Sequence, residues 1–164
     1  MKRLFLIFAS VVLFATAQAQ VETSTWFASS AAESGPTNIL SNGTFDDGSD
    51  WTAGANWSIG GGVASYDNGG TGNISQADGD MVSSVQINTD YTVQFDVTNL
   101  SGSNGFVSFN SSDAGVSYLG SQTITNGSMS FDFSTSSSVG IGGLQVRSLD
   151  DGAWDMDNLV LFER

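Results

Sequence analysis

Apolar and polar residues alternate along several short stretches of the chain, and this pattern predicts β-strands. In 91–97 every second residue is apolar, from Tyr91 to Val97. Successive side chains of a strand point to opposite faces, so these apolar residues share one face. The same period of two recurs in 129–133 and 144–146. Strands with one buried and one wet face are typical of antiparallel sheets.

Turn-forming Gly, Ser, Thr and Asn residues separate these stretches, and no helical periodicity is sustained from Asn38 onward. Regularly spaced short strands with turn signals predict a sandwich or barrel, and the number of strands fits two packed sheets. The class is therefore all-β, an antiparallel β-sandwich. The predicted strands are 38–41, 56–59, 62–66, 72–76, 81–87, 91–99, 105–110, 117–119, 122–125, 128–134, 139–147 and 155–162.

The first residues have the pattern of a secretory signal peptide. Lys2 and Arg3 precede an apolar run over 4–14, and small residues at Ala17 and Ala19 suit cleavage after Ala19. The run is too short for a membrane span, which needs about 20 apolar residues. Residues 1–19 are thus predicted to be removed, which places the protein outside the cell or on its surface, with no membrane insertion.

A small, polar segment follows at 20–37 and is predicted to be a flexible arm. Its aromatic pair, Trp26 and Phe27, is expected to pack on the domain or on a partner, so the arm could support self-association. Residues 38–164 are predicted to form one domain.

The chain is strongly acidic, with seventeen acidic and four basic residues. After cleavage only Arg147 and Arg164 remain basic, which gives a formal net charge of 2 − 17 = −15. Such a surface repels nucleic acid and anionic membranes and suits neutral glycans or divalent cations. The chain has no Cys and no His, so disulfides and the usual general base are missing.

The two ends of the predicted domain resemble a known family. The segments 38–46 and 154–162 are similar to the first and last strands of the jelly-roll carbohydrate-binding modules that accompany bacterial glycanases. The resemblance implies a jelly roll, glycan binding without catalysis, and a structural calcium ion. The matching positions are Asn42, Gly43, Phe45, Asp46 and Asp157.

The residues themselves also indicate a cation. Asp157 alternates with Leu159 and Leu161, so it would point inward if the leucines face the core. A buried carboxylate without a partner is costly, and Ca²⁺ would satisfy it, with Asp46 or Asp47 as the opposite ligand. Two alternatives stay open. Asp157 could lie at the sheet edge in water, or the other face could be buried, which carries Trp154, Met156, Val160 and Phe162.

Sugar rings stack on aromatic side chains, while amides and carboxylates bond their hydroxyls. We expect Tyr66, Tyr118 and Trp154 as aromatic platforms and Gln94 as a hydroxyl-binding side chain. For the tyrosines a half-buried structural role is the alternative, and Trp51 and Trp57 are expected in the core. A row of glutamines on one sheet could also bind hydroxyls. The glutamines on predicted strands are Gln76, Gln86, Gln94, Gln122 and Gln145.

No catalytic arrangement is expected. Without His no Ser/His/Asp set exists, and the acidic residues inside the predicted domain are all Asp, apart from the terminal Glu163. The sequence therefore predicts a secreted, non-catalytic module that binds a neutral glycan. The alternative is a structural or adhesive subunit of an extracellular assembly such as a matrix, a filament or a virion appendage.

Overall fold

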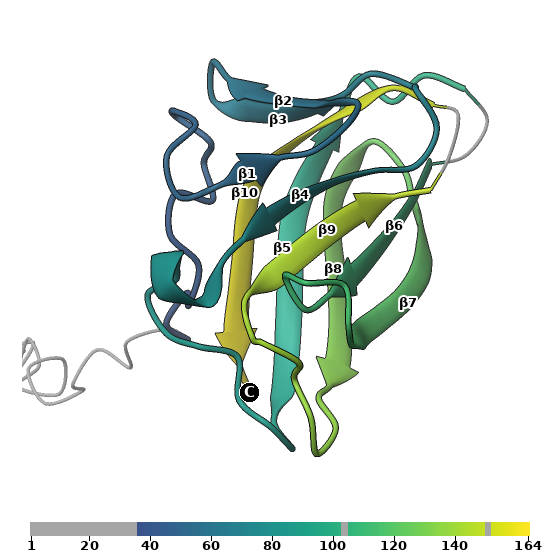
Figure 1. Ribbon diagram of the computed structural model, residues 1–164. Helices are drawn as coiled ribbons and strands as arrows, with labels where there is room; N and C mark the ends of the chain where they lie inside the picture. The colour runs from purple at the N-terminus through teal and green to yellow at the C-terminus, as the bar shows by residue number, and fades with distance from the viewer. Residues whose placement is uncertain (1–35, 103–104, 150–151) are drawn as a thin grey trace, which may run out of the picture. The chain divides into compact units, whose positions relative to one another are not determined.

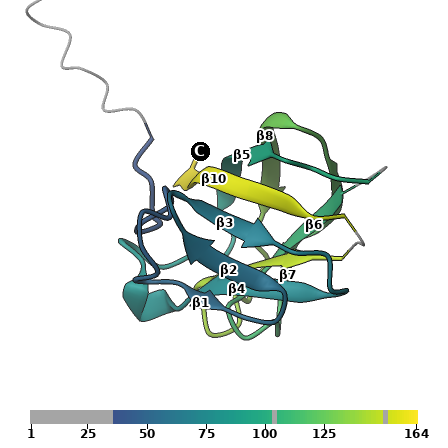
Figure 2. The ribbon, with the colours of Figure 1, turned by 90° about the horizontal axis from the view of Figure 1, so that it is seen from above.

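The computed structural model describes residues 36–102, 105–149 and 152–164, which fold into two antiparallel five-stranded sheets. Figures 1 and 2 show the two sheets as layers of a sandwich. Sheet A has the order β1-β4-β9-β6-β7, with strands Thr52–Ala53, Gly72–Gln76, Leu144–Ser148, Gly105–Asn110 and Ser117–Ile124. Sheet B has the order β2-β3-β10-β5-β8, with strands Trp57–Gly60, Val63–Tyr66, Trp154–Glu163, Asp90–Thr98 and Gly127–Ser134. The all-β jelly-roll prediction is confirmed.

A 3-10 turn, Asp78–Asp80, lies between β4 and β5. Within the described residues no helix has the length and apolar character that crossing a membrane requires. The predicted signal peptide and nearly all of the predicted arm, including Trp26 and Phe27, lie outside the described residues.

The alternating strands bury their apolar face between the sheets, as predicted. Tyr91, Val93, Phe95 and Val97 of β5 are all buried. The core of the opposite sheet comes from every second residue of three strands, namely Ile74, Val107, Phe109, Leu144 and Val146. Each such side chain contributes about 1.5–3 kcal/mol when fully buried. The core therefore fixes which residues of every strand face outward.

Two predicted strands, 38–41 and 81–87, are not strands in the structure. Ile39 donates its N–H to the carbonyl of Leu161 at 2.8 Å, and its own carbonyl accepts from Val82 and Ser83. The side chain of Asn38 accepts from the N–H of Leu161 at 3.0 Å, in the place of a backbone carbonyl. The segment 38–41 therefore lies beside β10, and the segment 81–87 lies beside 38–41, without either forming a ladder.

Other differences are smaller. The predicted strands 117–119 and 122–125 are one strand, β7, and the predicted strand 139–147 begins only at Leu144. Gly140, Gly142 and Gly143 adopt positive φ values, which an extended strand does not allow.

The last strand changes its buried face midway, which the sequence did not reveal. Trp154 and Met156 are buried, and so are Leu159 and Leu161. The change occurs at Asn158, which has a φ of 52°, where the pairing with β5 shifts between Asp157 and Val160. Such a bulge adds a residue to one strand and reverses the alternation beyond it. The prediction that Asp157 points inward is therefore wrong: it is only partly buried and shares the outer face.

Candidate functional site

The outward faces of the two sheets carry opposite kinds of side chains. The strands of sheet A contain no Asp or Glu and one basic residue, Arg147. The strands of sheet B contain no basic residue and six acidic ones, which are Asp90, Asp96, Asp132, Asp155, Asp157 and Glu163. Charge is therefore segregated between the faces.

The outer face of sheet B is internally hydrogen-bonded. Residues directly opposite each other on β5 and β8 form four successive side-chain pairs. These pairs are Ser134–Asp90, Thr92–Asp132, Gln94–Ser130 and Ser128–Asp96. Ser128 and Asn158 donate to Asp96, and these hydrogen bonds hold the pKa of its carboxyl below the ordinary value. Most polar groups of this face already have partners within the protein.

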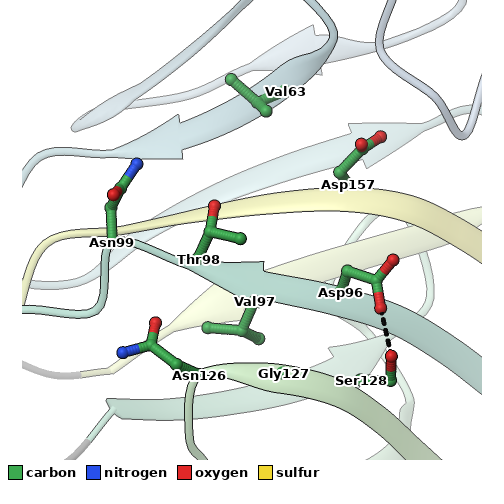
Figure 3. Close-up of a pocket in the computed structure, with 9 residues that line it drawn as sticks. All are labelled: Val63, Asp96, Val97, Thr98, Asn99, Asn126, Gly127, Ser128 and Asp157. Atoms are coloured by element: carbon green, nitrogen blue, oxygen red, sulfur yellow. Dashed lines mark hydrogen bonds between the residues drawn. The ribbon is translucent and has the colours of Figure 1, made fainter.

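A shallow groove of about 660 Å³ lies on this face, at the end of β5 and the start of β8. Figure 3 shows Asp157 and Asp96 on its wall, with Ser128 hydrogen-bonded to Asp96. Its other polar groups are also engaged, since Asn99 donates to Asp155 at 2.6 Å and Asn126 accepts from the N–H of Leu100. The groove thus offers few free donors or acceptors.

The outer face of sheet A carries transverse rows of polar side chains, which the strand register defines. One row crosses all five strands and comprises Thr52, Ser75, Gln145, Asn110 and Ser117. The next row, on the three inner strands, comprises Asn73, Arg147 and Ser108. These residues alternate with the core residues of the same strands, so their side chains point away from the core.

The side chains of these rows have no hydrogen-bond or ion-pair partner among the described residues. Gln145 is only 6% exposed. Its amide atoms are nevertheless not among the fully shielded side-chain atoms that lack a partner, so solvent still reaches them. Polar groups close to a protein surface that lack internal partners bond to water or to a ligand. This face therefore presents free amide, hydroxyl and guanidinium groups.

Phe106 supplies a half-buried aromatic side chain on the same face. It precedes Val107, whose side chain is in the core, and it lies opposite the exposed Thr123. Among the described residues all Trp and Tyr side chains are buried. Sequence reasoning considered only Trp and Tyr as platforms and so missed Phe106, although the alternation in 105–110 could have placed it.

The predicted ligand-binding residues lie in different places. Tyr66 and Trp154 are 1% exposed and pack with Trp57, at ring distances of 5.4 and 5.2 Å from it. Tyr118 is buried, donates to the carbonyl of Val139, and its burial raises its pKa to about 12. These three rings present no open face to a sugar. Gln94 is exposed, but on sheet B, where it pairs with Ser130.

The predicted calcium ligands do not form a carboxylate cluster. Within the described ranges no three His, Cys, Asp or Glu side chains gather closely enough to hold a metal ion. Asp46 accepts from the hydroxyl of Thr44, and Asp47 accepts from Ser49, whose hydrogen bonds lower the pKa of that carboxyl. Asp157 accepts from the N–H of Asn158 at 2.6 Å. Asp46 and Asp47 thus bond within their own loop, and Asp157 bonds to its neighbour at the bulge of β10.

Comparison with known proteins identifies the fold. No family model and no curated protein matches the chain. A solved family 4 carbohydrate-binding module is similar with 13% identity and a TM-score of 0.51, over 76% of this chain and 99% of that one. The N-terminal cellulose-binding domain of β-1,4-glucanase C from Cellulomonas fimi is 17% identical, with a TM-score of 0.55, over 78% and 98% of the two chains.

The enzymatically active domain of tailspike protein 4 from bacteriophage CBA120 is 15% identical with a TM-score of 0.50, over 77% of this chain and 21% of that one. Likeness at such low identity establishes architecture and leaves function to the site itself. The chain has the jelly-roll fold of carbohydrate-binding modules.

Proposed function

We propose that this protein is a secreted, non-catalytic module that binds a glycan on the outer face of sheet A. The observation that carries the proposal is the set of unpaired polar side chains on that face, centred on Gln145 and Arg147. Sugar hydroxyls both donate and accept hydrogen bonds, so they match free amides and hydroxyls. Phe106 adds an apolar surface for the C–H face of a sugar ring.

The dimensions of the face suit a linear chain of sugars. Neighbouring strands lie about 4.8 Å apart, so a row across five strands is about 19 Å long. An extended oligosaccharide lying across the strands would contact the side chains of the row in turn. The large negative charge of the chain favours a neutral backbone over a polyanion.

Binding without catalysis follows from the same side chains. Glycoside hydrolysis uses a pair of carboxyl groups that flank the scissile bond. The strands under the proposed binding face carry no carboxylate. Secretion rests on the signal peptide predicted at 1–19.

A structural calcium ion belongs to this proposal as a separate element. The opening segment lies against the last strand, since Leu159 donates to the carbonyl of Gly43 at 2.8 Å. A Cβ on Gly43 would come within 1.9 Å of the carbonyl oxygen of Leu159, so only glycine fits. The carbonyl of Thr44 lies beside Gly62, and Asp157 lines a groove with Val63. Asp157 and backbone carbonyls near the β2–β3 turn would therefore supply oxygen ligands of the kind Ca²⁺ binds.

Affinity electrophoresis with soluble β-glucan, xylan and mannan tests the proposed face. We expect the wild type to bind at least one polymer, and Gln145→Ala with Asn110→Ala to lose about tenfold in affinity, because two hydrogen bonds are removed. The matched control is Gln94→Ala with Ser130→Ala on sheet B, with no loss expected. Retained binding in the first variant and loss in the second would move the site to sheet B.

The assembly subunit remains the alternative function. Size-exclusion chromatography over a range of concentrations separates the two, because a binding module stays monomeric and an assembly subunit forms polymers.

A further inference from the structure

Arg147 occupies the centre of the proposed binding face. It lies on β9, the middle strand of sheet A, and its register neighbours are Asn73 on β4 and Ser108 on β6. The residue is exposed and alternates with the buried Val146 and Ser148. Its guanidinium therefore points to the side from which a ligand on this face would approach.

Among the residues that the structure describes, this guanidinium has no acidic partner, although the chain holds seventeen acidic residues. Among the described residues the ion pair formed is between Arg164 and Asp132, at 2.7 Å, on the other sheet. The strands around Arg147 contain no Asp or Glu. Arg147 is thus a cation without a carboxylate partner among the described residues, at the middle of a face whose polar side chains also lack described partners.

A guanidinium presents a planar fork of N–H donors that matches the two oxygens of a carboxylate. The half-buried Asn73 amide on β4 is placed to bond a neighbouring sugar hydroxyl, whereas Ser108 on β6 is only 7% exposed. A densely charged polymer is disfavoured, because the net charge of the chain is strongly negative and repels it. The ligand should therefore carry a carboxylate for the guanidinium and yet have a low overall charge. A mostly neutral glycan with isolated carboxylates has both properties.

We propose that Arg147 recognises an isolated carboxylate, such as that of a uronic acid, on an otherwise neutral glycan bound to sheet A. The proposal rests on the proposed function and deepens it by naming the substrate class. It makes Arg147 the residue that determines specificity, while Gln145 and Asn110 contact hydroxyls of any bound sugar.

The test uses the neutral polymer that binds best in the screen above and the same polymer with about one in ten of its sugars carrying a carboxylate. We expect the wild type to bind the sparsely charged form about fivefold more tightly, as a charge-assisted, bidentate pair is stronger than a neutral contact. Arg147→Gln should abolish this preference, so that the variant binds the charged and the neutral form equally. Arg164→Gln removes the same charge elsewhere and should keep the preference.

Each other outcome overturns a defined claim. Equal wild-type affinity for both polymers, or a preference that survives Arg147→Gln, refutes carboxylate recognition and leaves glycan binding intact. An equal loss on both polymers in Arg147→Gln makes the residue a general hydroxyl contact. Failure of every neutral polymer and its charged form to bind refutes the proposed function itself.

Discussion

Asn110 lies directly opposite Gln145 across β6 and β9, yet neither side-chain amide bonds to the other or to any other described residue. On sheet B the equivalent opposite pairs are hydrogen-bonded, as Ser128 is to Asp96. Cross-strand side-chain pairs are a main source of sheet stability. The contrast separates a face whose side chains bond to one another from a face whose side chains lack partners among the described residues.

Two glutamines should differ sharply in their effect on stability. Gln76 is fully buried and joins Ser41 through both amide atoms, at 2.8 and 3.1 Å. Gln76→Ala should cost roughly 2–4 kcal/mol of unfolding free energy, because it leaves two backbone groups unpaired. Gln145→Ala breaks no internal hydrogen bond and should cost less than about 1 kcal/mol. Urea unfolding of both variants checks this, and equal losses would contradict the assignment of Gln145 to the free face.

Two neighbouring phenylalanines should separate binding from folding. Phe109 is fully buried and packs against Phe95 at a ring distance of 5.9 Å, so Phe109→Ala should cost about 3–5 kcal/mol. Phe106→Ala removes a half-buried side chain and should cost about 1 kcal/mol, while lowering glycan affinity about five- to tenfold. Thermal melts and affinity electrophoresis measure the two effects. Unchanged glycan affinity in Phe106→Ala would exclude it as a platform.

The Ser128–Asp96 pair should contribute to stability in a pH-dependent way. The pKa of Asp96 is lowered from 3.8, mainly by the Ser128 hydroxyl and then by Asn158. A carboxyl with a lowered folded-state pKa stabilises the protein above its unfolded pKa, and this contribution is lost as the pH falls through the folded value. Ser128→Ala should therefore melt below the wild type at pH 6, and the gap should close as the pH falls below 3.8 and through the lowered pKa of Asp96. A gap that is independent of pH would show that charge is not involved.

Calcium should raise the melting temperature if the proposed ion is bound. At 100-fold excess over the dissociation constant, a ligand of the folded state adds about 2.7 kcal/mol. We expect a higher melting temperature in millimolar Ca²⁺ than in EDTA for the wild type and for Asp155→Ala. Asp157→Ala should lose the response. A wild type that is indifferent to calcium would remove the metal from the proposal and leave the glycan-binding face untouched.

The sequence predicted the sandwich because its central strands alternate without interruption. In 91–97 every second residue is apolar, and the register between β5 and β8 keeps that face in the core over eight pairs. The prediction that 38–41 and 81–87 form strands was wrong. Apolar residues alone do not provide a neighbouring strand with which a segment can form a hydrogen-bonded ladder. Asn38 replaces a backbone acceptor with its side chain, which no periodicity reveals.

The candidate site was harder to predict. The direction of Asp157 depends on a bulge at Asn158 that reverses the alternation of β10, and a bulge leaves no clear pattern in the sequence. The expected platforms Tyr66 and Trp154 both pack on Trp57 and thus belong to the core. Trp57 and Trp154 are far apart in the sequence, so this contact could not be predicted from it. The rows on sheet A depend on strand order, which joins β9 to β4 and β6 and can be obtained only from the fold.

The separation of six acidic residues on the strands of sheet B from one arginine on those of sheet A gives the sandwich a polarity along its thin axis. Packed sheets lie about 10 Å apart, which is close to the Debye length at 0.1 M salt. An anion in front of β9 is therefore partly screened from the carboxylates of sheet B at this ionic strength.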